Sequence, residues 1–193
     1  MYSISNIIVQ ASINNFGVDT MAAWTAYSKI DFIFWMINSA FGISVMTFVG
    51  QNYGAGKWDR IRRGTKICLG MALISAVSVS IILMSAERFL FGIFVNDVGV
   101  VEIGIRMMNV IAPAYLLFAF IEVFSGALRA QGAVVVSTLI TMVGICVLRM
   151  IWVTLVAARG TLEQVIICYP ITWAAGALAM SIYYIYKQRK IFQ

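Results

Sequence analysis

The 193-residue sequence contains no histidine, only two prolines and only 11% charged residues. Without histidine, both the commonest metal ligand and the commonest general base are absent. The cysteines Cys68, Cys146 and Cys168 lie inside apolar stretches and are odd in number, so we expect neither a disulfide framework nor a metal site. The sequence also has no paired carboxylates on one helix and no nucleophile elbow. These absences disfavour an enzyme, and we expect no cofactor.

Apolar surface is what the sequence has in excess. Hydrophobic residues make up 62% of the chain, more than a soluble domain of this length can bury. The longest apolar stretches reach the roughly twenty residues that a helix needs to cross a bilayer, and they are too long for barrel strands. The sequence therefore predicts an all-α membrane protein with a single transmembrane domain over residues 1–193. The predicted helices are 1–16, 24–50, 67–86, 103–128, 133–158 and 164–186, the first of them a truncated span.

The net charge of +6 is concentrated beside the ends of the apolar stretches. This placement favours lipid headgroups as neighbours and disfavours nucleic acid. The positive-inside bias predicts a multi-pass plasma membrane protein whose 57–66 loop and C-terminus are cytoplasmic. The cations on that side are Lys57, Arg60, Arg62, Arg63, Lys66, Arg129, Lys187, Arg189 and Lys190, and those on the other side are Arg88, Arg106 and Arg159.

A glycine-rich corner separates the second and third predicted helices. Gly50 and Gly54 lie four residues apart and share one helical face, which would let a neighbouring helix approach closely. Gly56 can end the helix. The corner reads Phe48, Gly50, Gln51, Asn52, Gly54, Ala55 and Arg60. This set resembles the F-x-G-Q-N-x-G-A-x-x-x-x-R corner in the second half of transporters of the multidrug and toxic compound extrusion (MATE) family.

A second stretch supports the resemblance. Residues 125–132 resemble the small-G-x-L-R-G-x-G corner of the same family, with Ala130 where many members have glycine. The resemblance implies a six-transmembrane-helix bundle, the C-terminal lobe of a twelve-helix transporter. It implies a secondary antiporter that exports cationic, amphipathic drugs or toxic compounds in exchange for H⁺ or Na⁺. The implied partners are a small-molecule cation, membrane lipids, and the N-terminal lobe or a second copy of this chain.

Polar residues inside the predicted spans are candidates for a substrate cavity. In the first helix Asn6, Gln10 and Asn14 recur every four residues and form one polar stripe. Two interpretations of the stripe are open, hydrogen bonding between helices and lining of a cavity. The other candidates share a helical face with an acidic residue, Tyr27, Trp35 and Asn38 with Asp31, and Tyr115 with Glu122.

Two acidic residues, Asp31 and Glu122, lie within predicted spans, and we expect them to couple ions. Asp31 lies roughly 10 Å below the outer surface at 1.5 Å per residue, at the same depth as Arg149, which predicts an ion pair between them. Glu122 lies one layer deeper and has no buried cation at its depth, so we expect it to carry a proton. The alternative for Glu122 is an ion pair with Arg129. The resemblance agrees, since this half of the family commonly carries coupling acids on its first, second or fourth helix.

Two other functions remain open at this point. One is a lipid-linked oligosaccharide flippase of the related superfamily, which should place more buried Arg and Lys at its cavity than Lys29 and Arg149. The other is an inactive truncated fragment.

Overall fold

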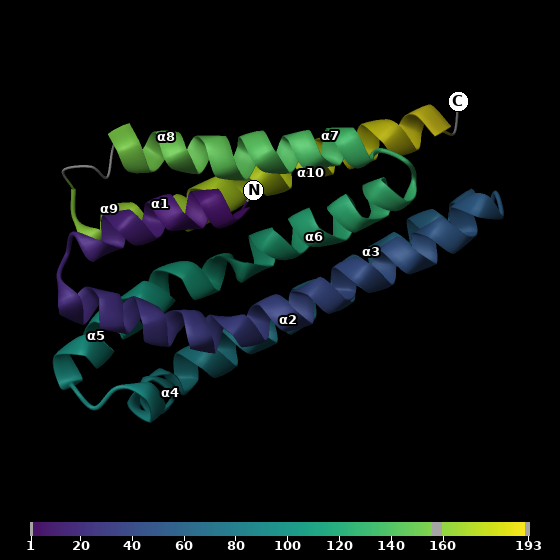
Figure 1. The fold of residues 1–193 in the computed structure, drawn as a ribbon. Helices are drawn as coiled ribbons and strands as arrows, with labels where there is room; N and C mark the ends of the chain where they lie inside the picture. Colours follow the sequence, from purple (N-terminus) through teal and green to yellow (C-terminus); the bar gives the residue numbers. More distant parts are fainter. Residues whose placement is uncertain (1, 156–159, 192–193) are drawn as a thin grey trace.

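A computed structural model describes residues 2–155 and 160–191, and nearly all of these residues are helical. Five helical segments are long and apolar enough to cross a membrane. They are Val18–Gly54, Trp58–Ser85, Val98–Ala130, Val134–Leu155 and Leu162–Lys190. The predicted all-α membrane bundle is therefore confirmed (Figure 1).

The first helix, α1 (Tyr2–Asn14), has 13 residues and covers only part of the length of the bundle (Figure 1). The chain then crosses back and forth. The α2–α3 corner, the α6–α7 turn and the C-terminal end of α10 lie together at one end, which we call the basic end because the predicted cytoplasmic cations flank these segments. The α1–α2 connection and α4 (Glu87–Phe94) lie at the opposite end.

The α2–α3 corner differs in detail from the prediction. Helix α2 (Val18–Gly54) continues four residues beyond position 50, and α3 (Trp58–Ser85) begins well before residue 67. Gly56 ends α2 as expected, with a φ of 66° that favours glycine. The predicted close packing at Gly54 is wrong for the described part of the chain, because no atom lies within 4 Å of a Cβ built there.

The other residues of the corner have separate positions. Asn52 is buried and donates a side-chain hydrogen bond to the carbonyl of Phe48, at 2.8 Å. Gln51 and Arg60 are exposed, and a Cβ at Gly50 would lie 4.0 Å from Ala130. The corner thus stabilises its own turn, and Gly50 approaches the end of α6.

The fourth predicted span is broken at Pro113. It consists of α5 (Val98–Ile111), a 3₁₀ turn (Ala112–Ala114) and α6 (Tyr115–Ala130). A proline within a span removes one backbone donor, and neighbouring helices must satisfy the carbonyls that this exposes. The carbonyl that Pro113 leaves without its helical donor is that of Asn109. The hydroxyl of Ser80 on α3 donates to another carbonyl in the break, that of Ala112, at 2.9 Å. The break is therefore supported from the adjacent helix, and α6 begins at Tyr115.

The fifth predicted span also contains an irregular segment. It consists of α7 (Val134–Thr141), a π-helix (Met142–Val147) and α8 (Leu148–Leu155), and its predicted end at 156–158 lies outside the described residues. The last span comprises α9 (Leu162–Ile166) and α10 (Cys168–Ile191). Gly144 in the π-helix approaches Gly176 of α10 closely. A Cβ added to Gly144 would lie 3.4 Å from the Cα of Gly176.

Helix α6 lies at the centre of the bundle and packs against α2, α3 and α10. Its closest approach is to α2. A Cβ added to Gly126 would lie 2.6 Å from the carbonyl oxygen of Gly42 and 2.8 Å from Val45. A Cβ added to Gly42 would overlap the carboxylate of Glu122. Glycine at both positions therefore permits the crossing of α2 and α6.

We predict that Gly126→Ala lowers the stability of the protein by about 1–3 kcal/mol, because the added methyl group meets a backbone carbonyl that cannot move aside alone. Gly70→Ala is the matched control, because Gly70 also lies in a spanning helix but has nothing within 4 Å of the built Cβ. Thermal unfolding followed with a thiol-reactive dye measures both variants, since the three cysteines are buried. Equal losses for the two variants would contradict the role of this crossing.

Candidate functional site

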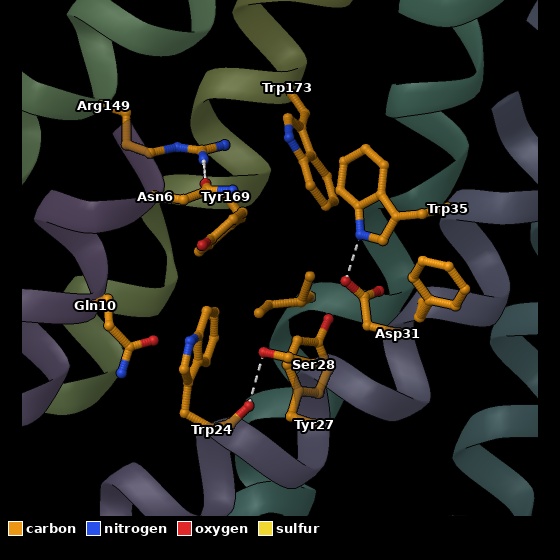
Figure 2. Close-up of a pocket in the computed structure, with 12 residues that line it drawn as sticks. Asn6, Gln10, Trp24, Tyr27, Ser28, Asp31, Trp35, Arg149, Tyr169 and Trp173 are labelled. Atoms are coloured by element: carbon orange, nitrogen blue, oxygen red, sulfur yellow. Dashed lines mark hydrogen bonds between the residues drawn. The ribbon is translucent and has the colours of Figure 1, made fainter. Parts of the chain in front are cut away.

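A cavity of about 580 Å³ opens between α1, α2, α8 and α10 (Figure 2). Its polar lining includes Asn6 and Gln10 from α1, Asp31 from α2 and Arg149 from α8. Helix α2 contributes the largest share of the wall, with Trp24, Tyr27, Ser28, Asp31, Phe32 and Trp35. The size is within the range of small-molecule sites in proteins, about 300–1,000 Å³.

The carboxylate of Asp31 accepts two hydrogen bonds at one side of this cavity. The indole Nε1 of Trp35 donates to Oδ2 at 2.5 Å, and the hydroxyl of Tyr115 donates to Oδ1. The hydroxyl of Tyr27 lies 3.2 Å from that of Tyr115 and completes the chain. Tyr115 is fixed by stacking on Phe34, with ring centroids 3.8 Å apart. Asp31 is thus held in one orientation by groups from two helices.

Arg149 lies on the other side of the cavity and is only 2% exposed. Its guanidinium donates to Oδ1 of Asn6 at 3.1 Å and to the hydroxyl of Thr172 at 3.5 Å. The guanidinium carbon lies 4.1 Å from the ring centroid of Tyr169. All these partners are neutral. Arg149 therefore joins α1, α8 and α10 without a carboxylate contact in the described chain.

The predicted ion pair between Asp31 and Arg149 is not formed. The ion pairs within residues 2–155 and 160–191 are Arg88 with Glu102, Arg106 with Glu163, and Arg129 with Glu122. Asp31 and Arg149 do line the same cavity, as their predicted depth suggests. Each of them, however, forms hydrogen bonds with neutral side chains.

Four of the seven predicted substrate-cavity residues line this cavity, namely Asn6, Gln10, Tyr27 and Trp35. Tyr115 reaches it through its hydrogen bond to Asp31. The remaining two lie elsewhere. Asn14 is exposed and accepts a hydrogen bond from Gln10 at 3.0 Å, whereas Asn38 is buried beside Ala72 and Ala76 of α3.

The sequence analysis missed most of the aromatic wall. Trp24, Tyr169 and Trp173 line the cavity, and the last two come from α10. The ring centroids of Trp24 and Tyr169 are 5.9 Å apart, and those of Tyr169 and Trp173 are 5.6 Å apart. Aromatic residues in a membrane helix are common on every face, so no local signal distinguished these three.

Glu122 lies in a second cavity, of about 360 Å³, between α6, α7 and the π-helix. Its Oε1 is 3.7 Å from a guanidinium nitrogen of Arg129, and its side chain is 23% exposed. The expectation that Glu122 lacks a nearby cation is therefore wrong, and the alternative pairing with Arg129 is the one formed. Ser125, Thr138 and Thr141 supply hydroxyl groups to the same cavity.

Comparison with known proteins identifies the family. The sequence model of the MatE family matches residues 1–155. The chain belongs to the MatE family. Residues 1–155 include α1, most of the cavity and Glu122, so the family assignment covers the functional candidates and confirms the resemblance seen in the two corners.

Two curated relatives align with the chain at low identity. The chain is 24% identical to the probable multidrug resistance protein YoeA of Bacillus subtilis, over 99% of this chain and 42% of that protein. It is 22% identical to human multidrug and toxin extrusion protein 1, over 79% of this chain and 28% of that protein. The chain thus spans less than half the length of these relatives.

The fold agrees with a solved MATE structure. A crystal structure of a variant of the Vibrio cholerae MATE transporter VcmN superposes with a TM-score of 0.90 at 17% identity, over 100% of this chain and 45% of that one. The described bundle therefore has the fold of about half of a MATE transporter, in a multi-pass membrane protein.

We predict that cysteines placed at two positions with amide side chains, Gln10 and Asn38, differ in reactivity. In a background free of the native cysteines, Gln10→Cys should react with a water-soluble maleimide, because Gln10 lines the large cavity. Asn38→Cys should not react, because that side chain packs against α3. Labelling followed by mass spectrometry measures both. Fast reaction at position 38 would mean that the cavity extends to α3.

Proposed function

We propose that this chain acts as one lobe of a MATE-type secondary antiporter that exports cationic, amphipathic compounds in exchange for H⁺ or Na⁺. The observation that carries the proposal is the cavity, which places the carboxylate of Asp31 among aromatic walls. A carboxylate attracts an organic cation, and the faces of Trp and Tyr rings add cation–π attraction. The family membership and the multidrug relatives support the same substrate class.

Ion coupling is assigned to Glu122, with Asp31 as the second candidate. Glu122 packs over Gly42 at the crossing of α2 and α6 and pairs with Arg129. A carboxylate in this position can exchange its arginine partner for a proton or a sodium ion, and the hydroxyls of Thr138 and Thr141 offer oxygen atoms nearby. Loading of Glu122 would thereby alter the contact on which α2 and α6 depend.

The transport cycle requires a second lobe. In twelve-helix transporters of this type the two halves are related by an axis along the membrane normal, and the substrate binds between them. The matching half would be an N-terminal lobe or a second copy of this chain. The exposed apolar residues of α2 and α8, such as Phe32 and Ile151, are available for lipid or for such a partner.

The basic end is assigned to the cytoplasm. It carries Lys57, Arg60 and Lys66 beside the α2–α3 corner, and Arg189 and Lys190 at the end of α10. The excess of cations on one side sets the orientation of a membrane protein.

We predict that Glu122→Gln abolishes cation efflux driven by an ion gradient, because glutamine can neither bind a proton nor release one. Uptake of ethidium into inside-out vesicles of cells producing the protein that contains this chain measures it. Glu102→Gln is the matched control, since Glu102 is surface-exposed and pairs with Arg88 outside the cavities. Efflux by the Glu122 variant at the wild-type level would refute the coupling role.

We also predict that Lys57→Cys reacts with a membrane-impermeant maleimide only when the cytoplasmic face is exposed. Inside-out vesicles should therefore label at position 57, and intact cells should not. Asp97→Cys, at the opposite end where Asp97 caps α5, should show the reverse pattern. Labelling of position 57 in intact cells would invert the assigned orientation.

A further inference from the structure

The charges around the large cavity are unevenly distributed. Asp31 is the acidic residue of its lining, and both carboxylate oxygens already accept hydrogen bonds from Trp35 and Tyr115. Arg149 is the basic residue of the same lining. Its partners in the described chain are neutral, so its charge lacks a counter-ion there. A cation buried in a membrane protein without a counter-ion is costly and marks a functional site by default.

The guanidinium of Arg149 also has unused donors. Arginine carries five N–H groups in a fixed planar arrangement, and two hydrogen bonds are made here, to Asn6 and Thr172. The Nε atom is buried and has no hydrogen-bond partner within the described residues, so the donors left for a ligand are the second N–H groups of Nη1 and Nη2. A planar fork with free donors at a cavity wall matches the geometry of a carboxylate.

A second cation, Lys29, lines a neighbouring cavity. This cavity, of about 410 Å³, shares Gln10, Trp24, Ser28 and Phe32 with the first. The ammonium of Lys29 lies 5.5 Å from the ring centroid of Phe94, in cation–π contact with it. The two neighbouring cavities are thus lined by two basic residues, Arg149 and Lys29, and one acidic residue, Asp31.

The wall between the charged groups is aromatic. Tyr169 stacks on the guanidinium of Arg149, and Trp24 and Trp173 lie beside Tyr169. In Figure 2 the rings of Tyr169 and Trp173 lie between Arg149 and Asp31, and Trp24 lies below Tyr169. Flat rings on this scale favour a planar aromatic body over an alkyl chain, because offset and edge-to-face contacts add to the area that is buried.

We propose that Arg149 forms an anion-binding subsite in this cavity, and that the compound bound there is a planar aromatic carboxylate. This inference rests on the proposed role of the cavity as the substrate site, and it adds a carboxylate group to the cationic compounds proposed above. A compound with a carboxylate at one end and an ammonium group at the other satisfies both sides, its carboxylate at Arg149 and its cation at Asp31. Lys29 attracts the carboxylate from the neighbouring cavity.

The test measures equilibrium binding to the protein that contains this chain, reconstituted in phosphatidylcholine nanodiscs, with empty nanodiscs as the blank. The probes are 2-naphthoate, the neutral 2-naphthylmethanol and the aliphatic octanoate. Wild-type protein should bind 2-naphthoate more tightly than either of the others. Arg149→Gln should raise the Kd of 2-naphthoate at least about tenfold, the loss expected for one charge-assisted hydrogen bond, and should leave that of 2-naphthylmethanol nearly unchanged.

Further variants separate recognition from structure. Arg149→Lys keeps the charge but loses the planar fork, so its affinity for 2-naphthoate should be intermediate. Lys29→Gln should weaken 2-naphthoate binding slightly, and the effect should shrink at high salt. Arg88→Gln removes an exposed cation at the same end of the molecule, outside the cavities, and should have no effect.

Three results would overturn the inference. One is an affinity for 2-naphthoate that does not change in Arg149→Gln. A carboxylate elsewhere in the protein that neutralises Arg149 would give this same result. Another is an equal loss for 2-naphthoate and 2-naphthylmethanol, which would assign Arg149 a structural role. Octanoate binding as tight as that of 2-naphthoate would exclude the aromatic requirement. These measurements involve no transport, so a wild-type protein that fails to export cations would count against the proposed antiport and leave this binding test intact.

Discussion

The crossing of α2 and α6 is the contact on which the rest of the bundle depends. The two backbones meet where Gly42 faces Gly126, and a side chain at either position would collide with the other helix. This approach places the carboxylate of Glu122 against Gly42 of α2. It also brings the N-terminal end of α6 beside α2, so that the hydroxyl of Tyr115 donates to Asp31. Both acidic residues of the membrane core are therefore positioned by one close contact between small residues.

The break at Pro113 serves the same arrangement. Because the proline interrupts the helical ladder, α6 starts afresh at Tyr115. The carbonyl of Ala112 accepts hydrogen bonds from the backbone N–H of Tyr115 and from the hydroxyl of Ser80. The ring of Tyr115 stacks on Phe34 while its hydroxyl binds Asp31. A break that would weaken a soluble helix is here supported by two neighbouring helices. It also places the hydroxyl of Tyr115 where it can donate to Asp31.

The two cavities separate two kinds of chemistry. The larger one, near the end opposite the basic end, contains aromatic walls with Asp31 and Arg149 on different sides. The smaller one contains Glu122 and Arg129 among hydroxyl groups. The first suits an organic compound with separated charges, whereas the second suits a proton or a small cation. Glu122 lines the small cavity and contacts Gly42 of α2, and α2 also forms a wall of the large cavity. Helix α2 therefore links the two cavities.

The sequence alone determined which segments lie in the membrane, where Gly56 ends α2 and the family to which the chain belongs, because hydropathy, glycine conformation and short corner motifs are local properties. It also placed Asp31 and Arg149 at one level. Only the tertiary structure decided their partners, the burial of Asn38 against α3 and the pairing of Glu122 with Arg129. Which side chains meet depends on how each helix is rotated about its axis, and the π-helix at Met142–Val147 changes that rotation ahead of Arg149 without any signal in the local sequence.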